Sequence, residues 1–310
     1  MKRQAGIALA ILVPPAAIAL LGWQLTKPAA PAPARVIVCQ ARCHYVGVAL
    51  TFMNQGHLTE FEQAADIKPG IVENYQAFGQ PFPSTWAGTL LAQGILPLIQ
   101  IQPGLAGLGA IAAGRYDRYL SQYAAAVRAL GGPVGLSFGH EMNGSWYSWG
   151  YRHVSPGVFV AAWQHIHRVF AAVGARNVVW VWTVVRKTPG DSRVDPTLRP
   201  WWPGKAYVNW VGLDIYYYSP PVTFRREFVP TITAVRSFTD DPILLTETAV
   251  PNQSGQVHQI ADLFAGARAS HLLGIIWYNQ DARHAWQLDK SRRAAIAAFR
   301  RGAARLLAPG

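Results

Sequence analysis

Two glutamates in this chain of 310 residues each lie at the end of a short apolar segment. Glu141 ends PVGLSFGHE (133–141), and Glu247 lies within PILLTETAV (242–250). The pattern predicts two buried strands, each of which presents a carboxyl group near its C-terminal end. Carboxyl groups held about 5–5.5 Å apart can cleave a glycosidic bond with retention, one as general acid and the other as nucleophile. Burial and mutual repulsion would keep one of them protonated near neutral pH while the other stays ionised.

The alternative for each glutamate is a structural carboxylate that pairs with an arginine at the edge of the fold. Aromatic residues beside the two segments favour the chemical interpretation. Trp146 and Trp149 follow Glu141, and Trp277 lies near the end of GIIWYNQ (274–280). Flat apolar rings stack on the CH faces of sugars, so we expect these three tryptophans to line a sugar-binding cleft.

The two glutamates belong to a regular series of eight short segments that are rich in β-branched and aromatic residues. The segments are 45–52, 70–78, 94–103, 133–141, 178–185, 208–218, 242–250 and 274–280. Helix-length stretches separate the later ones, and 114–132 and 155–175 carry apolar residues at helical spacing. This order predicts an α/β fold, a closed (β/α)8 or TIM barrel rather than an open doubly wound sheet. No glycine-rich phosphate loop follows the first segment, which disfavours a nucleotide-binding fold.

In such a barrel, chemistry gathers at the C-terminal ends of the strands. Besides the two glutamates, those ends carry Gln100, Gln102, His140, Asp214, Tyr216 and Asn279. The segments of Glu141 and Glu247 are the fourth and the seventh, which places them on facing sides of the ring. No third ligand stands at a suitable spacing from His140 and Glu141, so the sequence predicts neither a catalytic metal nor a cofactor.

These motifs resemble glycoside hydrolase family 26. HEMNGSWYSWG (140–150) resembles the acid/base segment of that family, ILLTETAV (243–250) its nucleophile strand, and VNWVGLDIYYY (208–218) its sixth strand. The resemblance runs in order from residue 45 to about residue 290. It implies a retaining mechanism with Glu141 as general acid/base and Glu247 as nucleophile. The implied substrate is most often β-1,4-mannan, with β-1,3-1,4-glucan and β-xylan as further members of the class.

The resemblance also implies roles for the neighbouring residues. His140 would hydrogen-bond the substrate or the nucleophile, Tyr216 would donate a hydrogen bond to the nucleophile, and Trp277 would stack on a sugar ring like Trp146. The full set of predicted substrate-binding residues is His140, Asn143, Trp146, Trp149, Tyr216, Trp277 and Gln102. One departure is Ser137, which stands where the family usually has an arginine that could help to set the ionisation of the carboxyl groups.

Other aromatic residues are predicted to fill the core. Trp163 lies inside a helical repeat and Trp180 inside a strand. Tyr217 should face the helices if Tyr216 faces the site, because neighbours on a strand point to opposite sides. The arginine-rich segment 291–305 is predicted to form a packed final helix with a solvated basic rim.

The net charge is +12, from 28 Lys+Arg against 16 Asp+Glu. An excess of this size suits an anionic envelope surface or a nucleic acid. Because the basic residues are scattered and the final helix reads as packed, no nucleic-acid partner is predicted.

The first 36 residues differ from the rest in composition. Residues 1–27 predict a signal peptide or an N-terminal membrane anchor, since MKR is followed by the uncharged apolar run 5–23. Residues 28–36 read as a Pro/Ala linker and 37–310 as the barrel domain. This organisation predicts an extracytoplasmic protein, secreted or held at the membrane through 5–23. The only two cysteines, Cys39 and Cys43, would close a small disulfide loop or remain thiols.

The leading hypothesis is therefore a retaining endo-glycosidase that hydrolyses a β-linked polysaccharide, with β-1,4-mannan as the first expected substrate. The second is a non-catalytic polysaccharide-binding barrel at the cell envelope, which the serine at position 137 keeps open. The third is a transglycosylase that uses the same site.

Overall fold

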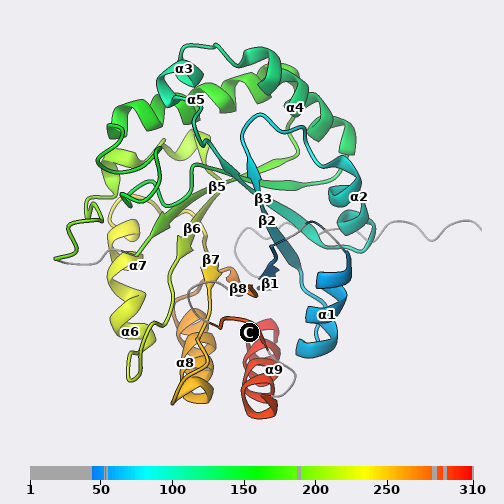
Figure 1. The fold of residues 1–310 in the computed structure, drawn as a ribbon, viewed down its shortest axis with the longest axis vertical. Coiled ribbons are helices and arrows are strands. Elements are labelled where there is room, and N and C mark those ends of the chain that lie inside the picture. Colours follow the sequence, from blue (N-terminus) through cyan, green and yellow to red (C-terminus); the bar gives the residue numbers. More distant parts are fainter. Residues whose placement is uncertain are drawn as a thin grey trace, which may run out of the picture. The chain divides into compact units, whose positions relative to one another are not determined.

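Eight parallel strands pair in chain order and close into a barrel, because β1 pairs with both β2 and β8. The strands are β1 (Tyr45–Ala49), β2 (Ile71–Ala77), β3 (Leu96–Gln102), β4 (Val134–Phe138), β5 (Val178–Val185), β6 (Trp210–Asp214), β7 (Ile243–Thr248) and β8 (Gly274–Tyr278). Each lies within one of the eight predicted segments. Figure 1 shows the strands at the centre with helices around them. The predicted (β/α)8 barrel is confirmed.

This computed structural model describes residues 44–51, 53, 55–186, 190–280, 285–288 and 292–308. They all belong to the unit Pro33–Gly310. The predicted signal peptide or anchor, the linker and both cysteines lie outside the described residues. Within the described part of the chain, no helix has both the length and the apolar character needed to cross a membrane.

Helices connect the strands, as the later part of the sequence predicts. They are α1 (Gln55–Ala65), α2 (Ser84–Ala92), α3 (Leu108–Ala112), α4 (Asp117–Leu130), α5 (Pro156–Val173), α6 (Phe224–Glu227), α7 (Val229–Arg236), α8 (Gln256–Ala269) and α9 (Arg293–Leu307), with the short 3-10 helices η1 (Arg199–Trp201) and η2 (Lys205–Tyr207). In α5 the Ser155 side chain accepts a hydrogen bond from the Val158 amide, and Gly174 ends the helix in the left-handed region at φ 80°. Helices α4 and α5 confirm the two predicted from periodicity.

The apolar core has two parts, one inside the barrel and one between the strands and the helices. Trp163 and Trp180 are buried in the outer part, as predicted. Tyr217 also faces outward, where its hydroxyl donates to Asp262 Oδ2 on α8 at 2.9 Å. The predicted final helix is α9, whose apolar face is buried.

Polar side chains replace apolar ones in the upper part of the barrel interior, toward the C-terminal ends of the strands. The buried set consists of Glu73, Gln100, Ser137, Thr183, Asp214 and Thr246. Ser137 Oγ lies 3.0 Å from Thr183 Oγ1, and Thr246 donates to Asp214 Oδ1 at 2.6 Å. Gly212 makes room for this layer, because a Cβ there would lie 2.4 Å from Thr183 Oγ1 and 2.7 Å from Thr246 Oγ1.

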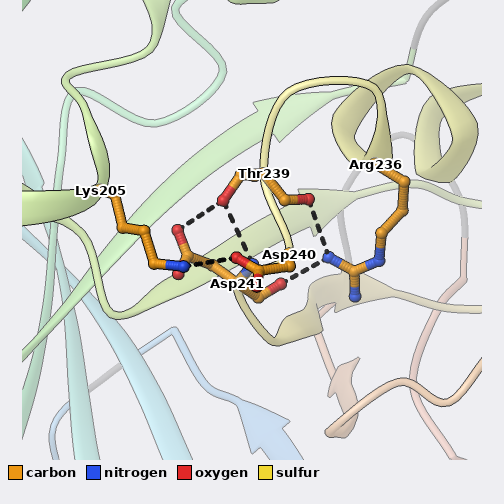
Figure 2. A network of polar contacts seen from close by, with 5 residues as sticks. All are labelled: Lys205, Arg236, Thr239, Asp240 and Asp241. Atoms are coloured by element: carbon orange, nitrogen blue, oxygen red, sulfur yellow. Dashed lines mark hydrogen bonds and ion pairs between the residues drawn. The ribbon is translucent and has the colours of Figure 1, made fainter.

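A polar network fixes the turn that leads from α7 into β7 (Figure 2). Arg236 donates to the backbone oxygen of Asp241 at 2.6 Å, and Thr239 Oγ1 donates to Asp241 Oδ2 at 2.7 Å. Lys205 reaches Asp240 from the other side at 2.6 Å. The Lys205 pair is exposed and contributes little, whereas the bonds to the turn backbone set the start of β7.

Candidate active site

A cleft of about 950 Å³ opens at the C-terminal ends of the strands. Its lining includes Glu141, Trp146, Tyr147, Arg186, Asp214, Tyr216, Tyr218, Glu247, Tyr278 and Trp286. The two glutamates singled out in the sequence thus face one cavity, although they are 106 positions apart (247 − 141).

Glu141 sits on a sharp bend just after β4. Its φ is 53°, in the left-handed region that residues other than glycine seldom adopt. The Glu141 amide donates to the Thr183 backbone oxygen at 3.0 Å, which ties the bend to β5. Trp146 Nε1 donates to Glu141 Oε2 at 2.6 Å. Trp146 is 44% exposed, so its ring both orients the carboxyl group and offers a face to a ligand.

Glu247 owes its direction to an extra residue in β7. Between two pairing positions, β7 advances from Leu244 to Glu247 while β6 advances only from Gly212 to Asp214. The same irregularity appears against β8. A bulge of this kind disrupts the alternation of side chains and can re-aim one of them at a site. Here Thr246 points into the barrel and Glu247 turns toward the cleft.

Two tyrosines hold the Glu247 carboxylate. Tyr75 donates to Oε1 at 2.6 Å and Tyr216 donates to Oε2 at 2.5 Å. The bond from Tyr216 was expected from the family resemblance. The bond from Tyr75 was not. With both oxygens engaged, the carboxylate is fixed in orientation and its ionised form is stabilised.

The surroundings of the two glutamates affect their pKa values differently. Burial, together with the nearby Glu247, raises the pKa of Glu141 to about 8, and the Trp146 hydrogen bond only partly opposes this. Burial also raises the pKa of Glu247, but the hydrogen bonds from Tyr216 and Tyr75 lower it. At neutral pH, Glu141 is therefore the group that keeps its proton, and Glu247 is the better candidate for the charged form.

Two further carboxyl groups lie beneath the cleft. Burial and the neighbouring Glu247 raise the pKa of Glu73 and of Asp214 well above their usual range. Both Glu73 oxygens and Asp214 Oδ2 lack a hydrogen-bond partner among the described residues. Both groups therefore favour the protonated form, whereas the two tyrosine hydrogen bonds favour the ionised form of Glu247.

Asn143 and His140, both predicted to bind substrate, are buried and are not among the residues that line the described cleft. Asn143 is fully buried, and its amide group bonds the backbone of Val185 on β5, accepting at 2.9 Å and donating at 3.1 Å. It anchors the loop and does not reach a substrate. His140 is 1% exposed, lies 3.3 Å from the Tyr147 hydroxyl and makes no described hydrogen bond to Glu247. Burial lowers the pKa of His140 to about 3, so it is neutral.

Three further predicted binding residues do not line the described cleft. Trp149 is 5% exposed because its ring stacks on Tyr147 at 4.2 Å. Trp277 is fully buried against Phe299 of α9, since its side chain points out of the barrel. Gln102 ends β3 but is not among the residues of the cleft.

The aromatic residues that do line the cleft beside Trp146 and Tyr216 escaped the sequence analysis. They are Tyr147, Tyr218, Tyr278 and Trp286. Tyr278 follows Trp277 and faces the interior, so alternation along β8 was the available signal. Arg186, at the end of β5, joins them; it is ion-paired with Glu227 and its guanidinium lies 5.8 Å from the Tyr218 ring centre. Residues 281–284 of the same region lie outside the described part of the chain.

A parallel eight-stranded barrel with two carboxyl groups on β4 and β7 facing one aromatic-lined cleft defines a class, the (β/α)8-barrel glycoside hydrolases. Known proteins agree with this. A sequence model of glycosyl hydrolase family 26 matches residues 100–248, which include both glutamates. Endoglucanase H of Acetivibrio thermocellus is 26% identical over 263 residues, which cover 80% of this chain and 29% of that protein.

A β-1,3-xylanase from a Vibrio species is 25% identical over 154 residues, or 49% of this chain and 30% of the relative. The chain thus spans less than a third of either relative. Among solved structures, a family 26 β-mannanase from Bacteroides ovatus has the same fold, with a TM-score of 0.65 at 14% identity over 84% of this chain and 88% of that one. The predicted resemblance to glycoside hydrolase family 26 is confirmed, over residues 100–248 by the sequence model and over most of the chain by the fold.

Proposed function

We propose that the protein is a retaining endo-glycosidase that cleaves a β-linked polysaccharide, with β-1,4-mannan as the first substrate to test. The observation that carries this proposal is that two carboxyl groups in one cleft differ in their hydrogen bonds and in the shifts of their pKa values. Glu141 bears a single tryptophan hydrogen bond and a pKa raised to about 8, whereas Glu247 is held by two tyrosine hydroxyls.

In the first step, Glu141 donates its proton to the glycosidic oxygen while a Glu247 oxygen attacks the anomeric carbon. The carbon–oxygen bond to the leaving saccharide breaks, and a glycosyl ester forms on Glu247. In the second step, ionised Glu141 removes a proton from water, whose oxygen attacks the same carbon and releases Glu247. The configuration at the anomeric carbon is retained because it is inverted twice.

The pH dependence follows from the two ionisations. The first step needs protonated Glu141, so activity falls as pH rises through about 8. It also needs ionised Glu247, so activity falls on the acid side as that group takes up a proton. We expect a bell-shaped profile for kcat/KM.

The choice of sugar rests on the family rather than on a contact in the cleft. The relatives named above act, by their names, on glucan, β-1,3-xylan and mannan. The aromatic lining of the cleft suits pyranose rings of any of these polymers. We further propose that the protein acts outside the cytoplasm, with residues 1–27 as a signal peptide or an anchor; cell fractionation tests this.

The decisive experiment compares the unaltered protein with Glu247→Gln on a panel of mannan, β-1,3-1,4-glucan and β-1,3-xylan, with new reducing ends as the readout. We expect cleavage of one polymer, lost by at least about 10³-fold in Glu247→Gln. Glu60→Gln, an equal change at an exposed position on α1, should leave the rate unchanged. Equal turnover in Glu247→Gln would refute the assignment.

The panel also separates the alternatives. A non-catalytic barrel would bind a polymer without releasing reducing ends. A transglycosylase would yield longer products when an acceptor oligosaccharide is added.

A further inference from the structure

A second cavity, of about 680 Å³, lies between α8 and α9 (neighbours in Figure 1). We call it the basic groove. Its basic residues are His44, His258, Arg268, His271, Arg301 and Arg305. The remaining lining is apolar and includes no carboxylate. The groove therefore carries the positive charge of three arginines with no carboxylate in its lining.

The groove is lined by His44, near the start of the described residues, together with residues of α8 and α9 and His271. The first 59 residues contain no Asp or Glu, and neither do residues 290–310, which hold six lysines or arginines. The barrel brings the two ends together, because β1 pairs with β8 and α9 packs on α8. The close fit of the two helices depends on Gly302, where a Cβ would lie 2.2 Å from the Phe264 ring. Residues as far apart in the sequence as His44 and Arg305 thus line one surface.

The arginines of the groove are not used elsewhere in the described structure. No described carboxylate lies within ion-pair distance of Arg301, Arg305 or Arg268, and Arg268 donates only to the Arg305 backbone oxygen. By contrast, their neighbour Arg300 turns away, donates to the Ala65 backbone oxygen at 3.0 Å and lies 3.5 Å from a carboxylate oxygen of Asp66.

The groove reaches the end of the barrel opposite the cleft. His44 directly precedes β1, and its Nδ1 donates to the backbone oxygen of Leu272 at 3.0 Å, just before β8. Arg268 and Arg305 lie in the last turns of α8 and α9, at the same end. A flat surface bound there would leave the cleft free. The chain also enters the barrel there, 21 positions after the apolar run 5–23 (44 − 23).

We propose that the basic groove docks the barrel on an anionic lipid surface, with its arginines binding phosphate groups of the lipid head groups. Guanidinium groups pair with phosphate in two-pronged hydrogen bonds, and basic residues near an anionic bilayer are attracted to its surface charge. The groove accounts for the clustering of arginines, and a barrel docked through it keeps its active cleft open to soluble polymer.

The competing explanation is that the arginines only offset the negative ends of the two helix dipoles. That effect is confined to the last turn of a helix. It covers Arg268 and Arg305 but not Arg301, which lies more than one turn before the end of α9, nor His258, which lies in the first turn of α8.

The test is flotation of the full chain with vesicles of pure phosphatidylcholine and with vesicles containing one third phosphatidylglycerol. The apolar segment binds both kinds alike, so the ratio of the two partition coefficients isolates the charge effect. We expect a ratio of roughly tenfold or more for the unaltered protein, lost in 0.5 M NaCl. In Arg301→Glu/Arg305→Glu the ratio should fall to about one.

The matched control is Arg115→Glu/Arg118→Glu, an equal charge change at exposed positions at and just before the start of α4. It should keep the ratio within about twofold. Arg301→Gln/Arg305→Gln provides a second variant without a new charge, and should lower the ratio to a smaller extent. The proposal is overturned if the groove variants keep the ratio of partition coefficients of the unaltered protein. A lower melting temperature with an unchanged ratio would show that the arginines only offset the helix dipoles. The proposal is also overturned if the control variant loses the ratio equally, because net charge would then suffice.

Discussion

Both oxygens of Glu247 accept a hydrogen bond from a tyrosine hydroxyl, one from Tyr216 just after β6 and one from Tyr75 on β2. Nucleophilic attack needs a carboxylate that is ionised and correctly turned, and the two phenols supply both conditions. They also oppose the burial that raises its pKa. The reactivity of one residue therefore depends on strands from three parts of the barrel.

We expect Tyr75→Phe to lower kcat by about 10- to 100-fold, since a hydrogen bond to a charged group contributes about 1.5–3 kcal/mol. The pKa of Glu247 should rise because its ionised form loses a donor. The acid limb of the kcat/KM profile should then move to higher pH. Tyr123→Phe is the control: its hydroxyl donates to Gln76 Oε1 at 2.7 Å away from the cleft. An acid limb that stays in place in Tyr75→Phe would contradict this role.

Trp146→Phe tests the other carboxyl group. The indole hydrogen bond favours ionised Glu141 and holds its pKa down. Without it the pKa should rise further above 8, so the alkaline limb of the profile moves to higher pH. Trp286→Phe, in the same cleft, should change KM without moving that limb. The measurement is the full pH profile of each variant, and a limb that moves to lower pH would count against the assignment.

At the scale of elements, the loop after β4 is the part that assembles the site. It carries Glu141 and Trp146, and it is fastened to β5 by the Asn143 side chain and to the 191–195 segment by backbone bonds from Ser145 to Arg193 and from Asp195 to Asn143. The loop is therefore part of the rigid scaffold.

We expect Asn143→Ala to destabilise the fold by roughly 1–3 kcal/mol, because it leaves buried backbone groups of Val185 unpaired. It should also lower kcat, since the loop that positions Glu141 loses its anchor. Asn177→Ala is the matched control: that side chain donates to the backbone of Val127 at 2.8 Å and of Gly132 at 2.7 Å, far from the cleft. Denaturant midpoints should fall in both variants, but kcat only in the first.

The elements themselves were largely predictable, because short apolar segments at regular spacing have few other solutions. All eight strands lie within the predicted ranges, and Glu141 and Glu247 reach the cleft. The directions of side chains were harder. On β8, Trp277 was expected in the cleft, but the strand places Tyr278 there instead. The type of a residue predicts what it can bind, whereas the parity of its position decides where it points.

Some features had no local signal. The bulge that turns Glu247 into the cleft is visible only when β7 is aligned with both neighbouring strands. The contact between Tyr75 and Glu247 joins positions 172 apart. Asn143 follows a catalytic-looking motif, yet its partner is a backbone that only the closed barrel brings near. Contacts between residues far apart in the sequence decide the roles of these side chains.

At the scale of the whole molecule, burial raises the pKa of each of the four carboxyl groups Glu73, Glu141, Asp214 and Glu247. The folded state then binds more protons than the unfolded chain, whose carboxyl groups titrate near pH 4. The stability contributed by these groups is fully present below that pH and is lost as pH rises through the folded values. The protein should be harder to unfold at pH 5 than at pH 8.

Glu73→Gln should flatten this dependence. The variant removes a fully buried ionisable group, so its melting temperature should exceed that of the unaltered protein by roughly 2–4 °C or more at pH 8 and match it near pH 4. Calorimetric scans at several pH values measure the difference. Parallel curves for the two proteins would mean that the pKa of Glu73 is the same in the folded and unfolded states, which would contradict this prediction.

The bend at Glu141, with its φ of 53°, places the catalytic acid at the expense of fold stability. The acid occupies a backbone conformation that glycine adopts more readily, and its carboxyl group is partly withdrawn from water. A lineage that no longer needed the reaction would gain a sturdier fold by discarding this one side chain.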